Sequence, residues 1–156
     1  MKGELILIKS LKKLINKTVY ENAAEYPWAK FKDFIISEDG KHVKSVVIMS
    51  ESLIPVPYTV RICDFAAIGD KKAILKPQVK PTVLKIEKEK PYMISNIKKH
   101  RFKKDGHSRK IFDVNFDTEA GEIVDFIITP FPTGRKMFIS PDSNDFDSIM
   151  SFYLNR

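Results

Sequence analysis

Three histidines are the first residues of this chain to consider for acid–base chemistry or metal binding, because imidazole titrates near neutral pH and commonly ligates metals. His42 lies in a predicted hairpin arm, whereas His100 and His107 lie in a lysine-rich stretch. No cysteine or carboxylate stands beside them at the spacing of a metal-ligand set. We therefore predict surface histidines and no metal site.

The remaining reactive side chains do not form a catalytic set either. Cys63 has no local nucleophile signature and is expected to be a small buried hydrophobe. Residues 142–147 are acidic like a calcium loop but lack its glycine and terminal glutamate, so a turn is predicted. Asp33 and Asp113 occupy matching positions, which favours structural hydrogen bonds. With no phosphate loop or serine–histidine–aspartate elbow, we predict a protein that is not an enzyme and holds no cofactor.

One basic stretch interleaves cations with an aromatic residue, Phe102, and is the best nucleic-acid candidate. Its cations would contact phosphates, and Phe102 could stack on a base. Alternatively, Phe102 is a core residue matching Val19 or Tyr20, and the stretch is a charged strand face; this interpretation is favoured. Alternation along a strand would then send neighbouring cations to opposite sides. The candidate residues are Lys98, Lys99, Arg101, Lys103 and Lys104.

A second candidate surface is aromatic. Tyr26 and Trp28 flank Pro27 in a predicted loop, and aromatic side chains in loops often anchor protein interfaces. We therefore predict that Tyr26 and Trp28 belong to a protein-binding surface.

Composition and charge exclude several classes of protein. The chain has 156 residues, of which 43% are apolar, so it is expected to fold. Residues 71–110 carry fourteen basic and three acidic side chains, whereas residues 111–156 carry three and eight. A basic segment of this kind suits an anionic partner, although solvated surface is the favoured interpretation. A single cysteine, no secretory signal and no long apolar run predict a cytoplasmic protein without a membrane span.

The elements that must position these residues occur twice. Residues 31–36 lead to Gly40 and then to valines 43, 46 and 47, and residues 111–116 lead to Gly121 and then to Val124, Ile127 and Ile128. In both copies an Asp-Phe-x-x-Ile segment begins 24 residues after that glycine. Agreement over such a span predicts an internal duplication.

Each copy is predicted to begin as a hairpin, because glycine closes a tight turn between β-branched arms. A third strand follows at 56–62 and at 136–140. A short helical turn is then expected at 64–68 and 145–149, since Asp caps helices and the apolar residues are three apart. Closing strands are predicted at 72–75 and 152–154. Between the copies, residues 77–90 are rich in proline and lysine and predict a linker with an extended stretch at 82–86.

Several short motifs resemble the PRC-barrel family, which includes the reaction-centre H subunit and the C-terminal domain of a bacterial ribosome maturation factor. The matching motifs cover nearly the whole chain: Ser10-Leu11, Thr18-Val19-Tyr20, Glu38-Asp39-Gly40, Val46-Val47-Ile48 and Ala67-Ile68-Gly69-Asp70, then Ser95-Asn96-Ile97, Lys104-Asp105-Gly106, Phe112-Asp113-Val114 and Glu119-Ala120-Gly121. Trp28-Ala29 and Met150 depart from the usual small residue or glycine.

The resemblance implies a mainly β protein of two small barrel modules with short helical turns. We place them at residues 1–76 and 91–156, with the linker at 77–90. It also implies a non-catalytic, protein-binding adaptor or tether. The alternative is an RNA- or ribosome-associated factor that uses the basic residues of 71–110. The sequence leaves the partner's identity and homo-oligomerisation open.

Overall fold

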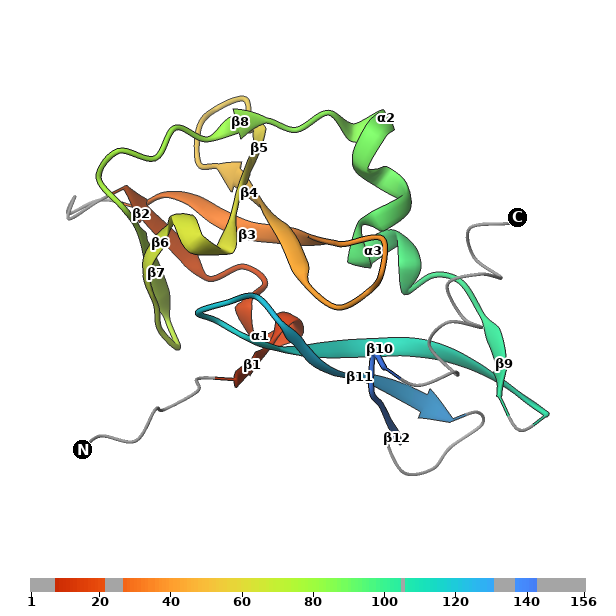
Figure 1. The fold of residues 1–156 in the computed structure, drawn as a ribbon. Coiled ribbons are helices and arrows are strands. Elements are labelled where there is room, and N and C mark those ends of the chain that lie inside the picture. The colour runs from red at the N-terminus through yellow and green to blue at the C-terminus, as the bar shows by residue number, and fades with distance from the viewer. Residues whose placement is uncertain (1–7, 22–26, 105, 131–136, 143–156) are drawn as a thin grey trace, which may run out of the picture.

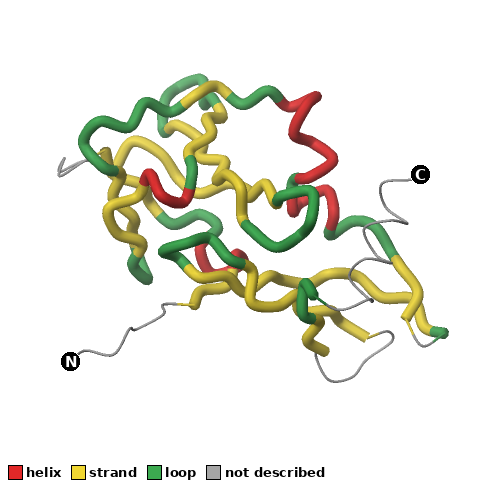
Figure 2. The backbone as a smooth tube through the Cα atoms, in the orientation of Figure 1, coloured by secondary structure: helices red, strands yellow, loops and turns green. Residues whose placement is uncertain are grey.

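The computed structural model describes residues 8–21, 27–104, 106–130 and 137–142, and these form two β-sheets with a few short helices (Figures 1 and 2). The predicted mainly β class is thus confirmed. No helix in these ranges is long and apolar enough to cross a membrane. Tyr26 and the elements predicted at 145–149 and 152–154 lie outside the described residues.

The larger sheet has seven strands in the order β6-β7-β2-β3-β4-β5-β8. Neighbouring strands are antiparallel except β2 and β7, which are parallel. The sequence predicts β7 with its observed bounds, and it predicts β5 within a longer stretch. The strands are β2 (Thr18–Glu21), β3 (Pro27–Ile36), β4 (Val43–Ser50), β5 (Pro57–Val60), β6 (Phe65–Ile68), β7 (Lys72–Leu75) and β8 (Thr82–Val83).

The smaller sheet has five strands, with the path β1-β10-β11-β12 and β9 paired to β10. All of its pairings are antiparallel. Within the described ranges neither sheet closes on itself, so the predicted barrels are not seen as closed sheets. The strands are β1 (Ile8–Ser10), β9 (Phe102–Lys104), β10 (His107–Asp117), β11 (Ile123–Pro130) and β12 (Met137–Ile139).

The helical segments are single turns at the joins between strands. The helical turn predicted at 64–68 is wrong, because a 3-10 turn ends at Asp64 and the strand β6 follows. A β-bulge between Phe65 and Ala67 places Phe65 and Ile68 on the same, buried side of the strand. These two buried residues are three apart in sequence, which is also the spacing of one face of a helix. The extended stretch predicted at 82–86 ends at Val83. The turns are α1 (Leu11–Leu14), η1 (Ile62–Asp64), α2 (Ile86–Glu89), η2 (Lys90–Tyr92) and α3 (Ile94–Ile97).

The hairpins β3-β4 and β10-β11 share one register. Phe31 pairs with Ile48 and Asp33 with Val47, with an irregularity between the two pairs. Ile111 pairs with Ile128, and Asp113 pairs with Ile127, with the same irregularity. Both hairpins also shift register just before the turn, and both turn glycines, Gly40 and Gly121, have positive φ, as predicted.

The tips of the two hairpins bond to each other. Val43 N–H donates to the carbonyl of Gly121 at 2.7 Å, and Ile123 N–H donates to the carbonyl of Lys41 at 2.8 Å. Behind these bonds, the ring of Phe34 lies 6.0 Å from the ring of Phe116. One cluster of buried side chains, drawn from both sheets and from α1 and α3, therefore forms the core.

Candidate functional site

The basic stretch is split between a helix end, a turn and a strand. Lys98 caps the end of α3, Lys99 lies in the turn after it, and β9 begins only at Phe102. The alternation predicted for a continuous strand is therefore wrong before Phe102. Lys103 and Lys104 lie in β9, and Arg101 donates from Nη1 to the Ser108 hydroxyl at 3.3 Å.

Phe102 cannot serve as a stacking platform. Its side chain is 7% exposed and belongs to the core. Phe102 of β9 pairs across the sheet with Arg109 of β10. At the matching place in the larger sheet, Val19 of β2 pairs with Ala29 of β3. This confirms the interpretation of Phe102 as a core residue, so any nucleic-acid contact here would depend on charge without base stacking.

Trp28, of the predicted aromatic surface, is a half-buried residue of β3. Its ring packs against the core and lies 5.7 Å from the Tyr58 ring, edge to face. The indole Nε1 is buried without a hydrogen-bond partner among the described residues. Trp28 therefore packs against the core on one side and exposes only part of its ring to solvent.

The other candidate reactive groups do not assemble. His42 is exposed near the tip of the first hairpin, and His100 is half-buried after α3. Cys63 is exposed, so its predicted burial is wrong: it sits between Ile62, which points into the core, and the capping residue Asp64. The described residues contain no group of three or more ligating side chains that could hold a metal ion.

Asp33 and Asp113 each fasten a helix of the opposite half, which confirms their structural role. Asp33 accepts from its neighbour Phe34 N–H at 2.8 Å and from Ser95 N–H of α3 at 3.1 Å, and it also accepts from the Ser95 hydroxyl. Asp113 accepts from its neighbour's amide at 2.8 Å and from Lys12 N–H of α1 at 2.9 Å. Helix α1, which precedes β3-β4 in the chain, is therefore held by the β10-β11 hairpin, and α3, which precedes β10-β11, is held by the β3-β4 hairpin.

Among the described residues, two carboxylates have a lowered pKa. The Ser37 hydroxyl and the Lys41 amide donate to Asp39 at 2.6 and 3.0 Å and hold its pKa below the usual 3.8. The Lys9 ammonium donates to Asp70 at 2.5 Å and lowers the pKa of that exposed carboxyl. Asp39 orders the turn before Gly40, and Asp70 joins β1 of one sheet to the β6-β7 turn of the other.

The loop between β4 and β5 presents two apolar side chains to solvent. Leu53 is 103% exposed and Ile54 is 81% exposed. The loop is held by hydrogen bonds: the Ser50 hydroxyl accepts from Val56 N–H at 2.9 Å, and the Ser52 hydroxyl donates to the Ile54 carbonyl at 2.8 Å. Sequence reasoning missed this pair. The available signal was two large apolar residues in a short segment that otherwise consists of serine, glutamate and proline, residues typical of a polar loop.

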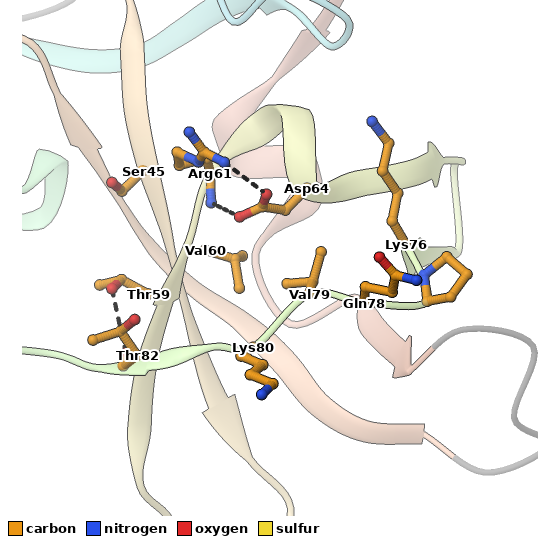
Figure 3. A pocket seen from close by; sticks show the side chains of 11 residues that line it. Ser45, Thr59, Val60, Arg61, Asp64, Lys76, Gln78, Val79, Lys80 and Thr82 are labelled. Atoms are coloured by element: carbon orange, nitrogen blue, oxygen red, sulfur yellow. Dashed lines mark hydrogen bonds and ion pairs between the residues drawn. The ribbon is translucent and has the colours of Figure 1, made fainter.

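A cavity of about 660 Å³ lies between β5 and the segment that leads from β7 to β8 (Figure 3). Val60 and Val79 point toward each other in it, whereas Lys76 and Lys80 extend away on opposite sides. Thr59 Oγ1 donates to the Thr82 carbonyl at 3.3 Å and closes one wall. The lining residues are Ser45, Thr59, Val60, Arg61, Asp64, Lys76, Pro77, Gln78, Val79, Lys80 and Thr82.

The single acidic group of this lining, Asp64, is already engaged. Its carboxylate accepts from Arg61 N–H at 2.8 Å and forms an ion pair with Arg61 Nη2 at 3.5 Å. Within the described chain, neither Lys76 nor Lys80 forms an ion pair. Sequence reasoning assigned residues 77–90 to a linker and so missed the cavity, because only the fold brings Lys80 beside β5.

Searches against protein-family models and against curated proteins find no match to this chain. The resemblance to PRC-barrels therefore rests on the short motifs of the sequence alone.

Proposed function

We propose that this chain is a non-catalytic protein-binding adaptor made of two PRC-barrel-like units, residues 1–76 and 91–156, that arose by duplication. Support comes from the hairpins β3-β4 and β10-β11, whose register shifts fall at matching residues. Further support is the matched use of Asp33 and Asp113 on α3 and α1. An adaptor needs a rigid scaffold with an exposed contact surface, and no catalytic geometry.

The observation that carries the binding role is the exposure of Leu53 and Ile54 on an ordered loop. Burying a side chain of this size in a partner yields about 1.5–3 kcal/mol. Since hydrogen bonds already fix the loop through Ser50 and Ser52, little conformational entropy would be lost on binding. The expected partner is a protein with an apolar pocket that accepts this pair.

The test is a pull-down from cell lysate with the purified full chain as bait, compared with the variant L53S/I54S as bait. Its matched control is V124S/F138S, which removes exposed apolar side chains from the smaller sheet; Val124 is 41% exposed and Phe138 is 62% exposed. We expect one stoichiometric protein partner, recovered by the parent and the control, and lost with the loop variant at an unchanged melting temperature. Equal recovery of the partner by the loop variant would refute the role of the loop in binding. Turnover of a metabolite by the pure chain would refute a non-catalytic role.

The RNA-associated alternative is an outcome of the same experiment. Nuclease treatment would then abolish recovery, and a mobility shift would weaken steeply with salt, by a log-log slope of about −0.7 per phosphate contact on a single strand. Changing Lys98, Lys99, Arg101, Lys103 and Lys104 together to Gln should abolish that shift. Salt-independent or absent binding by the parent chain excludes this alternative.

A further inference from the structure

A basic cavity lies at the corner where the two sheets meet. Its volume is about 660 Å³, and its walls come from β1, α1, the turn before β2 and the turn between β6 and β7, with one residue of β10. Figure 1 shows β1 and α1 close to the end of β7. The lining has four lysines and a single carboxylate, Asp70, so it carries a surplus of positive charge.

Three of these lysines lie around one point, which the Asp70 carboxylate marks. Lys9 Nζ donates to Asp70 Oδ1 at 2.5 Å. This hydrogen bond lowers the pKa of the Asp70 carboxyl, and the positive charges of Lys9, Lys13 and Lys17 lower it further. Because such effects fade with distance in water, three ammonium groups lie near the place where one anionic group already sits.

This set of cations is not neutralised. Among the described residues, neither Lys13 nor Lys17 forms an ion pair. The fourth lysine, Lys12, is not counted, because its Nζ lies over an aromatic ring, 3.6 Å from the centroid. The Lys9 side chain is 18% exposed and that of Asp70 is 88% exposed. Asp70 can therefore turn into solvent and give up its place beside Lys9 to an entering anion.

The donors favour phosphate over carboxylate. Lysine ammonium groups are separate point charges and lack the planar fork with which arginine pairs with a carboxylate. A terminal phosphate group presents three acceptor oxygens in different directions and carries about −1.5 to −2 charges near neutral pH, so several separate ammonium groups can bond to it. The volume of about 660 Å³ lies within the range of about 300–1,000 Å³ found for small-molecule sites and leaves room for more than one such group.

We propose that this cavity binds a small oligophosphate, an anion of two or more linked phosphate groups. One phosphate group would take the place of the Asp70 carboxylate beside Lys9, and Lys13 and Lys17 would neutralise further charge. None of the lining residues belongs to the β4-β5 loop, so the inference goes beyond the adaptor function and does not rest on it.

The test uses isothermal titration calorimetry on the full chain in a phosphate-free buffer, with tripolyphosphate, inorganic phosphate and citrate as probes. We expect saturable binding of tripolyphosphate that weakens as salt is raised, and binding of the other two that is weaker by about tenfold or more. Equally tight binding of citrate would refute the preference for phosphate. Equally tight binding of inorganic phosphate would refute a site for linked groups, and no saturable binding of tripolyphosphate would overturn the proposal.

The variant K13Q/K17Q should weaken tripolyphosphate binding by about tenfold or more, because charge-assisted hydrogen bonds are lost. The control K85Q/K88Q removes the same charge from exposed residues outside the cavity and should change affinity by less than about twofold. Equal weakening by both variants would contradict the assigned site. Matching melting temperatures verify that both variants are folded.

The variant D70N gives the opposite prediction. It removes the negative charge that competes for Lys9, so it should tighten tripolyphosphate binding by about threefold or more. Unchanged or weaker binding by folded D70N would show that the anion does not take the place of the Asp70 carboxylate, which overturns the proposed geometry.

Discussion

Replacing Asp33 with alanine should destabilise the protein more than any conservative change on its surface. Asp33 is 5% exposed, and its carboxylate accepts from two backbone amides, those of Phe34 and Ser95. Alanine would leave both donors without their acceptor, and each such loss costs about 1–3 kcal/mol, with the larger cost at the buried Phe34 amide and the smaller at the part-buried Ser95 amide. The Ser95 hydroxyl can turn to solvent, because its residue is exposed. We therefore expect a loss of about 3–4 kcal/mol in the free energy of unfolding.

The matching change at Asp113 should cost less, about 2–3 kcal/mol, because the helix it holds has a second cap. Ser10 caps α1 by accepting from Lys13 N–H at 3.2 Å, whereas the residue at the start of α3, Met93, makes no side-chain capping bond. Asp33 thus performs for α3 the task that an N-cap side chain usually performs for its own helix.

Asparagine provides the control. Asp33 accepts both amide bonds on Oδ1, and so does Asp113. An asparagine Oδ1 can keep both bonds, so D33N and D113N should cost only about 1 kcal/mol, the difference between a charged and a neutral acceptor.

The assay is urea unfolding followed by circular dichroism, with the slope checked for two-state behaviour. For a chain of this length, D33A should lower the melting temperature by roughly 6–16 °C. The reasoning is refuted if D33A stays within about 0.5 kcal/mol of the parent, or if D33N is as damaging as D33A. A larger loss for D113A than for D33A would refute the argument from the missing cap.

Two further predictions concern the hairpin turns. Gly121 has φ +77° and a Cβ there would meet the Val43 carbonyl at 3.1 Å, whereas Gly106 has φ +79° with open space around it. G106A should therefore cost about 1–2 kcal/mol from backbone strain alone and G121A clearly more, as measured by urea unfolding; equal losses would contradict the close contact between the two hairpin tips. Because hydrogen bonds from Ser37 and Lys41 lower the pKa of Asp39, its contribution to stability is present above the unfolded pKa near 3.8 and lost as pH falls through the lower folded pKa. An NMR titration should find the Asp39 pKa below 3.8, and the variant S37A should raise it; an unchanged value in S37A would show that the hydroxyl is not the cause.

The features that the sequence predicts well are those fixed by neighbouring residues. Gly40 and Gly121 close tight turns, and the β-branched runs beside them form hairpin arms, because both effects act within a few residues. The helical turn predicted at 64–68 failed because a bulge places Phe65 and Ile68 on one face, and a spacing of three apolar positions does not distinguish a bulged strand from a helical turn.

The candidate site could not be predicted in the same way, because its parts meet only in the folded chain. The cavity joins Arg61 and Thr59 to Lys76 and Lys80, which the sequence places in or beside a linker. The basic stretch was found from composition, but its geometry depends on where α3 ends and on the burial of Phe102. Exposure of Leu53 likewise depends on the hydrogen bonds that fix its loop.

The reciprocal helix contacts explain why the two proposed units would be kept together in one chain. A unit of about 70 residues buries only about 60% of its unfolded surface and is marginal alone. Here α1 is held by Asp113, 101 residues away, and α3 by Asp33, 62 residues away. Strand β1 likewise pairs with β10, while Met93 bridges to Ile35. Loss of either half would therefore remove the helix anchor and a strand partner of the other, so we expect the two halves to unfold in one transition.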